Sequence, residues 1–81
     1  MMSMKPSYAE FRELVKAQLS DYLAGLNDER LEEYLREKDS IDVIQNEYDH
    51  SSLMYDQGMI TDHIFRNGSV SATVYTLYLL Y

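Results

Sequence analysis

Apolar residues recur at helical spacing along the first third of the chain. The positions are Phe11, Leu14, Val15, Leu19, Tyr22 and Leu23, with Leu26 just beyond. Residues three and four apart share one face of a helix, so these side chains form a single stripe. Ser7 and Glu10 have the spacing of a capping box, and Gly25 suits the left-handed conformation that ends helices. The pattern predicts a helix that begins after Ser7 and ends by Gly25.

Two further helices are predicted in the middle of the chain. Asn27 is a favourable N-cap, and its helix carries a thin apolar stripe of Leu31, Tyr34 and Leu35. A third helical face ending at Gly58 consists of Ile41, Ile44, Tyr48, Ser51 or Ser52, and Tyr55. We place the break between these helices at Asp39-Ser40, where either residue can act as a cap. One bent helix over residues 28–57 is the alternative, because no Pro or Gly interrupts this stretch.

The last third of the chain permits two interpretations. In the favoured one, a short helix capped by Thr61 ends at Asn67-Gly68, and a final helix starts at Ser69 or Ser71. The apolar residues of these two helices are Ile64, Phe65, Val70, Val74, Leu77 and Tyr81. In the alternative, Asn67-Gly68 is the type I′ turn of a β-hairpin, since the residues after it favour strands.

These patterns together predict an all-α fold, a compact bundle of four to five short helices. The alternative is an α+β fold with a C-terminal hairpin around Asn67-Gly68. We expect one domain over residues 1–81, with residues 1–6 disordered. A chain of 81 residues without cysteine builds only a marginal core. Self-association that buries more apolar surface would therefore stabilise it.

Negative charge is concentrated in the middle of the chain. Residues 21–62 contain twelve acidic residues and three basic ones, a local charge of −9, whereas the whole chain carries −7. Such a field repels the phosphates of nucleic acids and anionic lipids, so we expect no direct nucleic-acid or membrane binding and favour a protein partner with a basic surface. No signal peptide or run long enough to span a bilayer is recognisable, which predicts a soluble, cytoplasmic protein.

The acidic residues expected to form an interaction face lie on polar helix faces. They are Asp28, Glu29, Glu32, Glu33, Glu37, Asp42, Glu47 and Asp49. We expect Arg30, Arg36 and Lys38 to neutralise this face in part. An exposed, partly neutralised face favours recognition over acid–base catalysis, which needs buried carboxylates with separated pKa values.

No combination of residues carries a catalytic signature. Glu47 and His50 have the Glu-x-x-His spacing of carboxylate-bridged di-iron bundles, but those proteins need two such pairs and two more glutamates. The other histidine, His63, follows Asp62 in an expected turn. Without cysteine, and with three isolated glycines, the chain has neither a thiol nucleophile nor a phosphate-binding loop. We expect no enzyme, no catalytic or metal-binding residues and no cofactor.

Tyrosine is unusually frequent, with eight residues and no tryptophan. Near the C-terminus, Tyr75, Tyr78 and Tyr81 are interleaved with leucines, including Leu79. A helix that is apolar nearly all round must be covered on several sides. These four residues therefore belong either to the core or to a self-association interface, where tyrosine is enriched.

Two short segments of the chain resemble a known group of proteins. They are the opening Tyr8-Ala9-Glu10-Phe11 and the closing run from Phe65 to Ser71 with the terminal Leu-Leu-Tyr. The group consists of small acidic proteins of unknown role encoded on phages and conjugative elements of gut Firmicutes. The resemblance implies a bacterial, mobile-element setting and assigns no activity or site residues.

The sequence therefore predicts a non-enzymatic protein-binding module. The first hypothesis is an acidic helical adaptor or inhibitor that docks on a basic partner, in its extreme form a nucleic-acid mimic. The alternative is a structural protein that self-associates, as a homodimer, through its Tyr/Leu-rich C-terminal segment. The two are compatible, since a dimer presents two acidic faces.

Overall fold

Helices make up most of the chain that the structure describes. The computed structural model describes residues 4–80, which form α1 (Tyr8–Tyr22), α2 (Asp28–Arg36), α3 (Lys38–Asp56) and α4 (Val70–Leu80). A π-helical segment, η1 (Ile64–Ser69), leads directly into α4. No strand occurs within residues 4–80. The predicted all-α bundle is confirmed, and the hairpin alternative is wrong.

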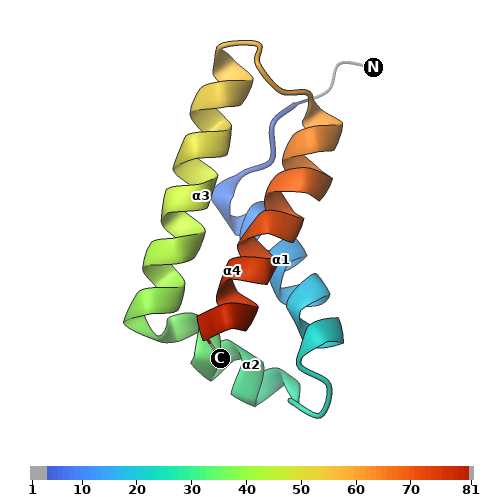
Figure 1. Cartoon of the computed structure of the whole chain (residues 1–81), viewed down its shortest axis with the longest axis vertical. Coiled ribbons are helices and arrows are strands. Elements are labelled where there is room, and N and C mark those ends of the chain that lie inside the picture. The colour runs from blue at the N-terminus through green and yellow to red at the C-terminus, as the bar shows by residue number, and fades with distance from the viewer. Residues whose placement is uncertain (1–3, 81) are drawn as a thin grey trace.

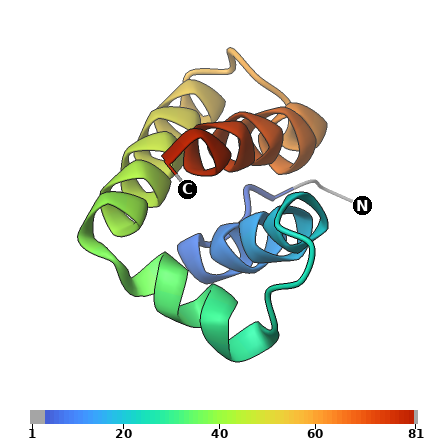
Figure 2. The same ribbon diagram turned by 60° about the horizontal axis from the view of Figure 1, so that its bottom comes forward.

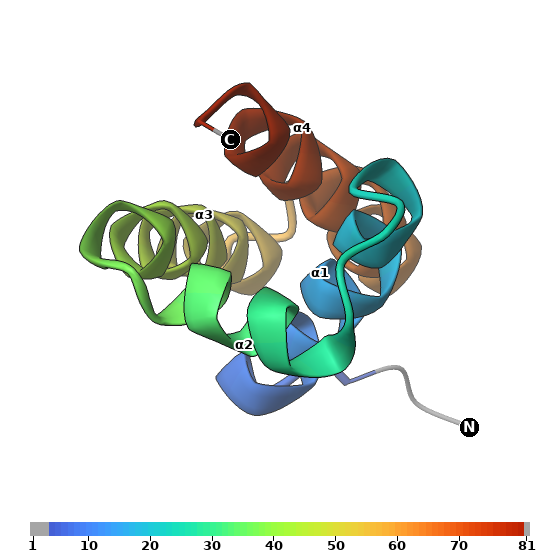
Figure 3. The same cartoon turned by 90° about the horizontal axis from the view of Figure 1, so that it is seen from below.

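The four helices surround one core (Figures 1 and 2). α1 and α4 pack side by side, and α3 lies against both of them and runs antiparallel to α4. The short α2 crosses the end of the bundle where α1 stops and α3 begins (Figure 3). The Tyr34 hydroxyl of α2 donates to the Leu77 carbonyl of α4, so these two helices also touch at this end of the bundle. Within residues 4–80, no helix is sufficiently long and apolar to cross a membrane.

Local capping determines where α1 and α2 begin. The Glu10 amide donates to Ser7 Oγ at 3.1 Å, and the Arg30 amide donates to Asn27 Oδ1 at 2.8 Å. Both predicted caps are therefore confirmed. The Glu10 carboxylate pairs with Arg66 and so does not complete a capping box. After α1, Gly25 adopts a φ of +98°, a conformation that suits glycine and lets the chain turn into α2.

The break between α2 and α3 lies at Glu37, two residues before the predicted position. Glu37 is extended, with φ −65° and ψ 147°, and α3 begins at the next residue. Ser40 cannot cap a helix at the surface because its side chain is buried, with 2% exposed. An earlier start places Ser40 and Ile44, one turn apart, on the inner face of α3.

The sequence predicts that a helix ends at Asn67-Gly68. The structure instead continues through these two residues as one helical run. Thr61 acts as the expected cap, since the Ile64 amide donates to Thr61 Oγ1 at 3.2 Å. Gly68 has no positive φ, and the Asn67 side chain donates to the His63 carbonyl one turn earlier at 3.0 Å. The continuous run lets Phe65 enter the same core as the buried residues of α4.

The core is apolar and is closed by aromatic contacts. Its buried members are Phe11, Val15, Leu19, Leu23, Leu31, Leu35, Ile44, Phe65, Val70, Val74 and Leu77. The rings of Phe11 and Phe65 meet at 5.8 Å between centroids, and Tyr48 packs against both. No buried side-chain nitrogen or oxygen among the described residues lacks a hydrogen bond. For example, the buried Thr73 hydroxyl donates to the Ser69 carbonyl at 2.8 Å.

Residues 4–6 contact the helices, whereas the disorder expected for residues 1–6 stays a prediction. The Tyr48 hydroxyl donates to the carbonyl of the buried Pro6 at 2.7 Å. Lys5 Nζ lies 3.0 Å from Asp56 on α3, and Arg66 donates to the Met4 carbonyl at 2.9 Å. Long-range polar contacts therefore hold this segment on the bundle. Residues 1–3 lie outside the described residues.

Replacing the cap of α2 tests how strongly it stabilises the fold. We expect Asn27→Ala to lower the free energy of unfolding by about 1 kcal/mol, because the Arg30 amide loses its acceptor. In thermal unfolding this corresponds to roughly 5 °C in a domain of this size. Asn46→Ala, at an exposed position inside α3, is the matched control and should not destabilise. An equal loss in both variants would contradict the capping role.

Candidate interaction surface

Most of the acidic residues predicted to form an interaction face are accessible. Six have exposed side chains, namely Asp28, Glu29, Glu33, Glu37, Asp42 and Asp49, whereas Glu32 and Glu47 are half-buried. The eight do not form one continuous face. They separate into an inner pair on α2, an outer group on α2 and its end, and residues of α3 on different sides of that helix.

The inner pair of acids attaches α2 to α1. Lys16 Nζ lies 2.6 Å from Glu32 Oε1 and 3.0 Å from Asp28 Oδ1, and Arg12 lies 3.6 Å from Glu32. Each helix presents its two charges one turn apart, so the pairs meet where the helices cross. Asp28 and Glu32 are therefore engaged within the fold. The cations come from α1, which the sequence reasoning missed, although both pairs show i,i+4 spacing.

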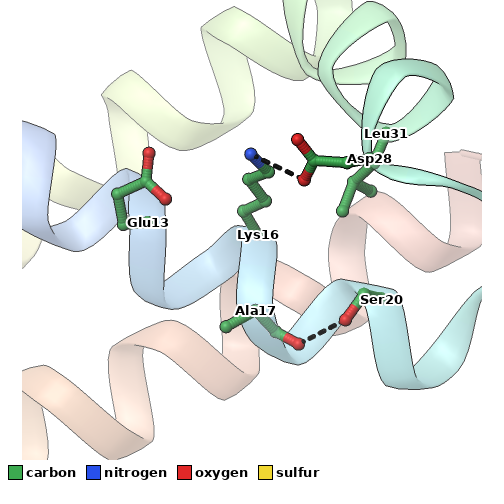
Figure 4. Close-up of a pocket in the computed structure, with 6 residues that line it drawn as sticks. All are labelled: Glu13, Lys16, Ala17, Ser20, Asp28 and Leu31. Carbon is green, nitrogen blue, oxygen red and sulfur yellow. Dashed lines mark hydrogen bonds and ion pairs between the residues drawn. The ribbon is translucent and has the colours of Figure 1, made fainter.

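A shallow hollow lies beside this ion-pair cluster (Figure 4). It has a volume of about 260 Å³ and is lined by Glu13, Lys16, Ala17, Ser20, Asp28 and Leu31. Hydrogen bonds to Glu32 and then to Asp28 raise the pKa of Lys16 above its ordinary value. A lysine that holds its proton more tightly is a poor base or nucleophile at neutral pH. The Ser20 hydroxyl donates to the Ala17 carbonyl at 2.7 Å, so the hollow offers binding groups but no activated nucleophile.

The outer acids of α2 face solvent. Glu29 and Glu33 are one turn apart on the side away from α1, and Glu37 follows at the end of the helix. We call these three residues the outer acidic face. Arg30 reaches Glu33 at 3.8 Å, with both side chains largely exposed. Within residues 4–80, Glu29 and Glu37 form no ion pair, and neither do Arg36 and Lys38, which were expected to neutralise this region.

A second hollow adjoins the outer acidic face. It measures about 130 Å³ and is lined by Leu26, Arg30, Glu33, Tyr34 and Glu37. Its walls combine apolar surface from Leu26 and the Tyr34 ring with two carboxylates, one of which has a long contact with Arg30. Lysine and arginine have an apolar stem and a cationic end, so their side chains match this combination.

The predicted acids of α3 point in different directions. Asp42 and Asp49 are two turns apart on the same side, and Asp49 accepts a hydrogen bond from Gln45 Nε2 at 2.9 Å. At about 100° per residue, Glu47 lies roughly 140° around the helix from Asp42. Glu47 therefore does not share a face with the other two. Among the described residues, no group of three or more His, Asp or Glu side chains could hold a metal ion.

The tyrosine- and leucine-rich end of the chain is largely outside the core. Tyr75, Tyr78 and Leu79 have 58%, 44% and 64% of their surface exposed. The inner side of α4 is formed instead by Val70, Thr73, Val74 and Leu77. The sequence analysis assigned this group either to the core or to a self-association interface. These three residues are not part of the core. Tyr81 lies outside the described residues.

Comparisons with protein-family models, curated proteins and solved structures gave no match. The resemblance to proteins of phages and conjugative elements therefore stays a prediction.

The ion pairs between α1 and α2 predict how stability changes with pH. The hydrogen bond from Lys16 lowers the pKa of Glu32, so folding favours its charged form. This stabilisation is present above the unfolded pKa of about 4.3 and is lost as the pH falls through the lower folded value. We expect the urea midpoint of the wild type to fall more between about pH 6 and pH 3 than that of Glu32→Gln.

Glu33→Gln is the control for this measurement, because Glu33 is exposed and its contact with Arg30 is long. This variant should keep the pH dependence of the wild type. If Glu32→Gln also kept it, the attachment of α2 to α1 through Glu32 would be disproved.

Proposed function

We propose that the chain is a non-enzymatic binding module, an acidic helical adaptor or inhibitor that docks on a basic surface of another protein. The observation that carries the proposal is the outer acidic face, where Glu29, Glu33 and Glu37 are all exposed. Their only ion pair within residues 4–80 is the long contact between Arg30 and Glu33. These carboxylates are thus available to a partner, whereas Asp28 and Glu32 already bind Lys16.

The hollow beside the outer acidic face supports a partner that supplies lysine or arginine. A cationic side chain lying along Leu26 and Tyr34 would bring its charge between Glu33 and Glu37. Burying the apolar stem adds to the attraction between charges, which is weak at an exposed surface. The net charge of −7 also speeds the encounter with a basic protein.

A matched pair of triple variants tests this proposal. The partner is captured from a lysate of the encoding cell and identified by mass spectrometry, and its affinity is then measured with purified proteins. We expect Glu29→Gln/Glu33→Gln/Glu37→Gln to weaken binding about tenfold at low salt, because each exposed charge contributes up to about 1 kcal/mol. Affinity of the wild type should fall as ionic strength rises.

The control carries Asp21→Asn/Asp42→Asn/Asp49→Asn, which neutralises three other exposed acids. It should retain most of the affinity, since the proposal concerns position and not only net charge. An equal loss in both variants, or an affinity indifferent to salt, would contradict docking through the outer acidic face. In the extreme version, a nucleic-acid mimic, double-stranded DNA should compete with the chain for its partner.

A further inference from the structure

The outward side of the last helical run carries an apolar ridge. Its members are Gly68, Ala72, Tyr75 and Leu79, all exposed, and we call this row the α4 ridge. Their spacing of four, three and four residues keeps them on one line of a helix, opposite Val70, Val74 and Leu77. Tyr78 borders the ridge on the α1 side, where its ring lies 5.6 Å from that of Tyr22. The ridge therefore has small residues at one end and large ones at the other.

Charge is absent from this part of the chain. Residues 67–81 include no Asp, Glu, Lys, Arg or His, although the whole chain carries a net charge of −7. Two copies that met through most other surfaces would bring like charges together, which costs free energy. The α4 ridge avoids this cost. Its lack of charge also makes it a poor match for a strongly basic or acidic partner, so a second copy is the occupant that the charge distribution favours.

Nothing in the packing of a single chain requires a glycine at position 68. Gly68 has no positive φ, and an added Cβ would meet only Ile64 Cγ2 at 3.5 Å, an ordinary contact. A glycine inside a helix nevertheless costs roughly 1 kcal/mol relative to alanine. A close approach by another chain is a physical reason to keep a residue without a side chain at an exposed helical position.

We propose that two copies of the chain form a symmetric dimer in which their α4 ridges pack antiparallel. Tyr75 of each copy would cover Ala72 of the other, and Leu79 would cover Gly68. Both pairings have the same midpoint, between residues 73 and 74, so a single two-fold axis satisfies them together. In a two-fold interface, if a residue of the first copy contacts a different residue of the second, the same two positions also meet with the copies exchanged.

The size of the ridge sets the strength of the dimer. A tyrosine side chain offers about 200 Å², so the exposed parts of Tyr75 and Tyr78 amount to roughly 200 Å² in each copy. Leu79 and the small residues add to this, but the total stays below the ~800 Å² that each partner contributes to a standard interface. We therefore expect a weak dimer, with a Kd on the order of 100 µM.

Single-cysteine variants test the geometry directly, because the chain has no cysteine of its own. Gly68→Cys and Leu79→Cys proteins, distinguished by mass, are mixed at high micromolar concentration and oxidised mildly. A disulfide needs Cα atoms about 4.4–6.8 Å apart. In the antiparallel pair, residue 68 of one chain lies roughly 16 Å along the helix axis from residue 68 of the other, and the same holds for residue 79. We expect the mixed cross-link to exceed either self-cross-link at least fivefold.

Two results would overturn the proposal. Dominant self-cross-links would indicate a parallel arrangement, and a mixed yield no higher than that of Ala9→Cys with Leu79→Cys would indicate random collision. Ala9 is an exposed alanine on α1. Circular dichroism of each variant before oxidation shows whether it is folded.

Sedimentation provides a second measurement, with a charge placed in the ridge. The average mass of the wild type should rise above the 9.5 kDa of one chain between about 10 µM and 1 mM. We expect Ala72→Arg to remain monomeric over this range and Ala9→Arg to behave as the wild type. A wild type that is monomeric throughout, or equal association in both variants, would exclude the α4 ridge as the interface. Either outcome leaves the test of the outer acidic face unaffected, since Glu29, Glu33 and Glu37 are not part of the α4 ridge.

Discussion

The contact between the first and last helices is the interaction on which the other parts of the fold depend. Phe11 on α1 meets Phe65 at the start of the final helical run, with ring centroids 5.8 Å apart and both side chains fully buried. Around this contact, α3 runs antiparallel to α4, and α2 is a short segment that crosses between α1 and α3. The burial of α1 against α4 therefore determines which surfaces remain exposed elsewhere.

The position of α2 at the edge of this packing explains its composition. Only Leu31 and Leu35 are buried, so most of the helix is in contact with water and tolerates charge. The acids nearest α1 find cations on that helix, and Lys16 holds both Asp28 and Glu32. Of the acids on the far side, Glu33 has a long contact with Arg30 of the same helix, and Glu29 and Glu37 form no ion pair within residues 4–80. The packing of α2 on α1 thus separates the acids of α2 into two groups. Those facing α1 form ion pairs within the fold, and those on the other side remain accessible.

Features with a local cause could be predicted from the sequence, whereas those set by neighbouring helices could not. The caps at Ser7, Asn27 and Thr61 need only a side chain and an amide three residues later, and all three form. The break at Glu37 and the continuous helix through Gly68 depend on which side chains enter the core, which no short window reveals. Similarly, the contacts of Lys16 follow from the way α2 crosses α1, a property of the folded chain.

The two surfaces proposed for binding differ in their physics, and salt should separate them. Attraction between the outer acidic face and a cationic partner weakens as ions screen it. Pairing through the α4 ridge involves no charged side chain of that ridge, and screening reduces the repulsion between two copies that each carry −7. Rising ionic strength should therefore weaken the first contact and strengthen the second. The outer acidic face and the α4 ridge share no residue, so one chain presents both surfaces.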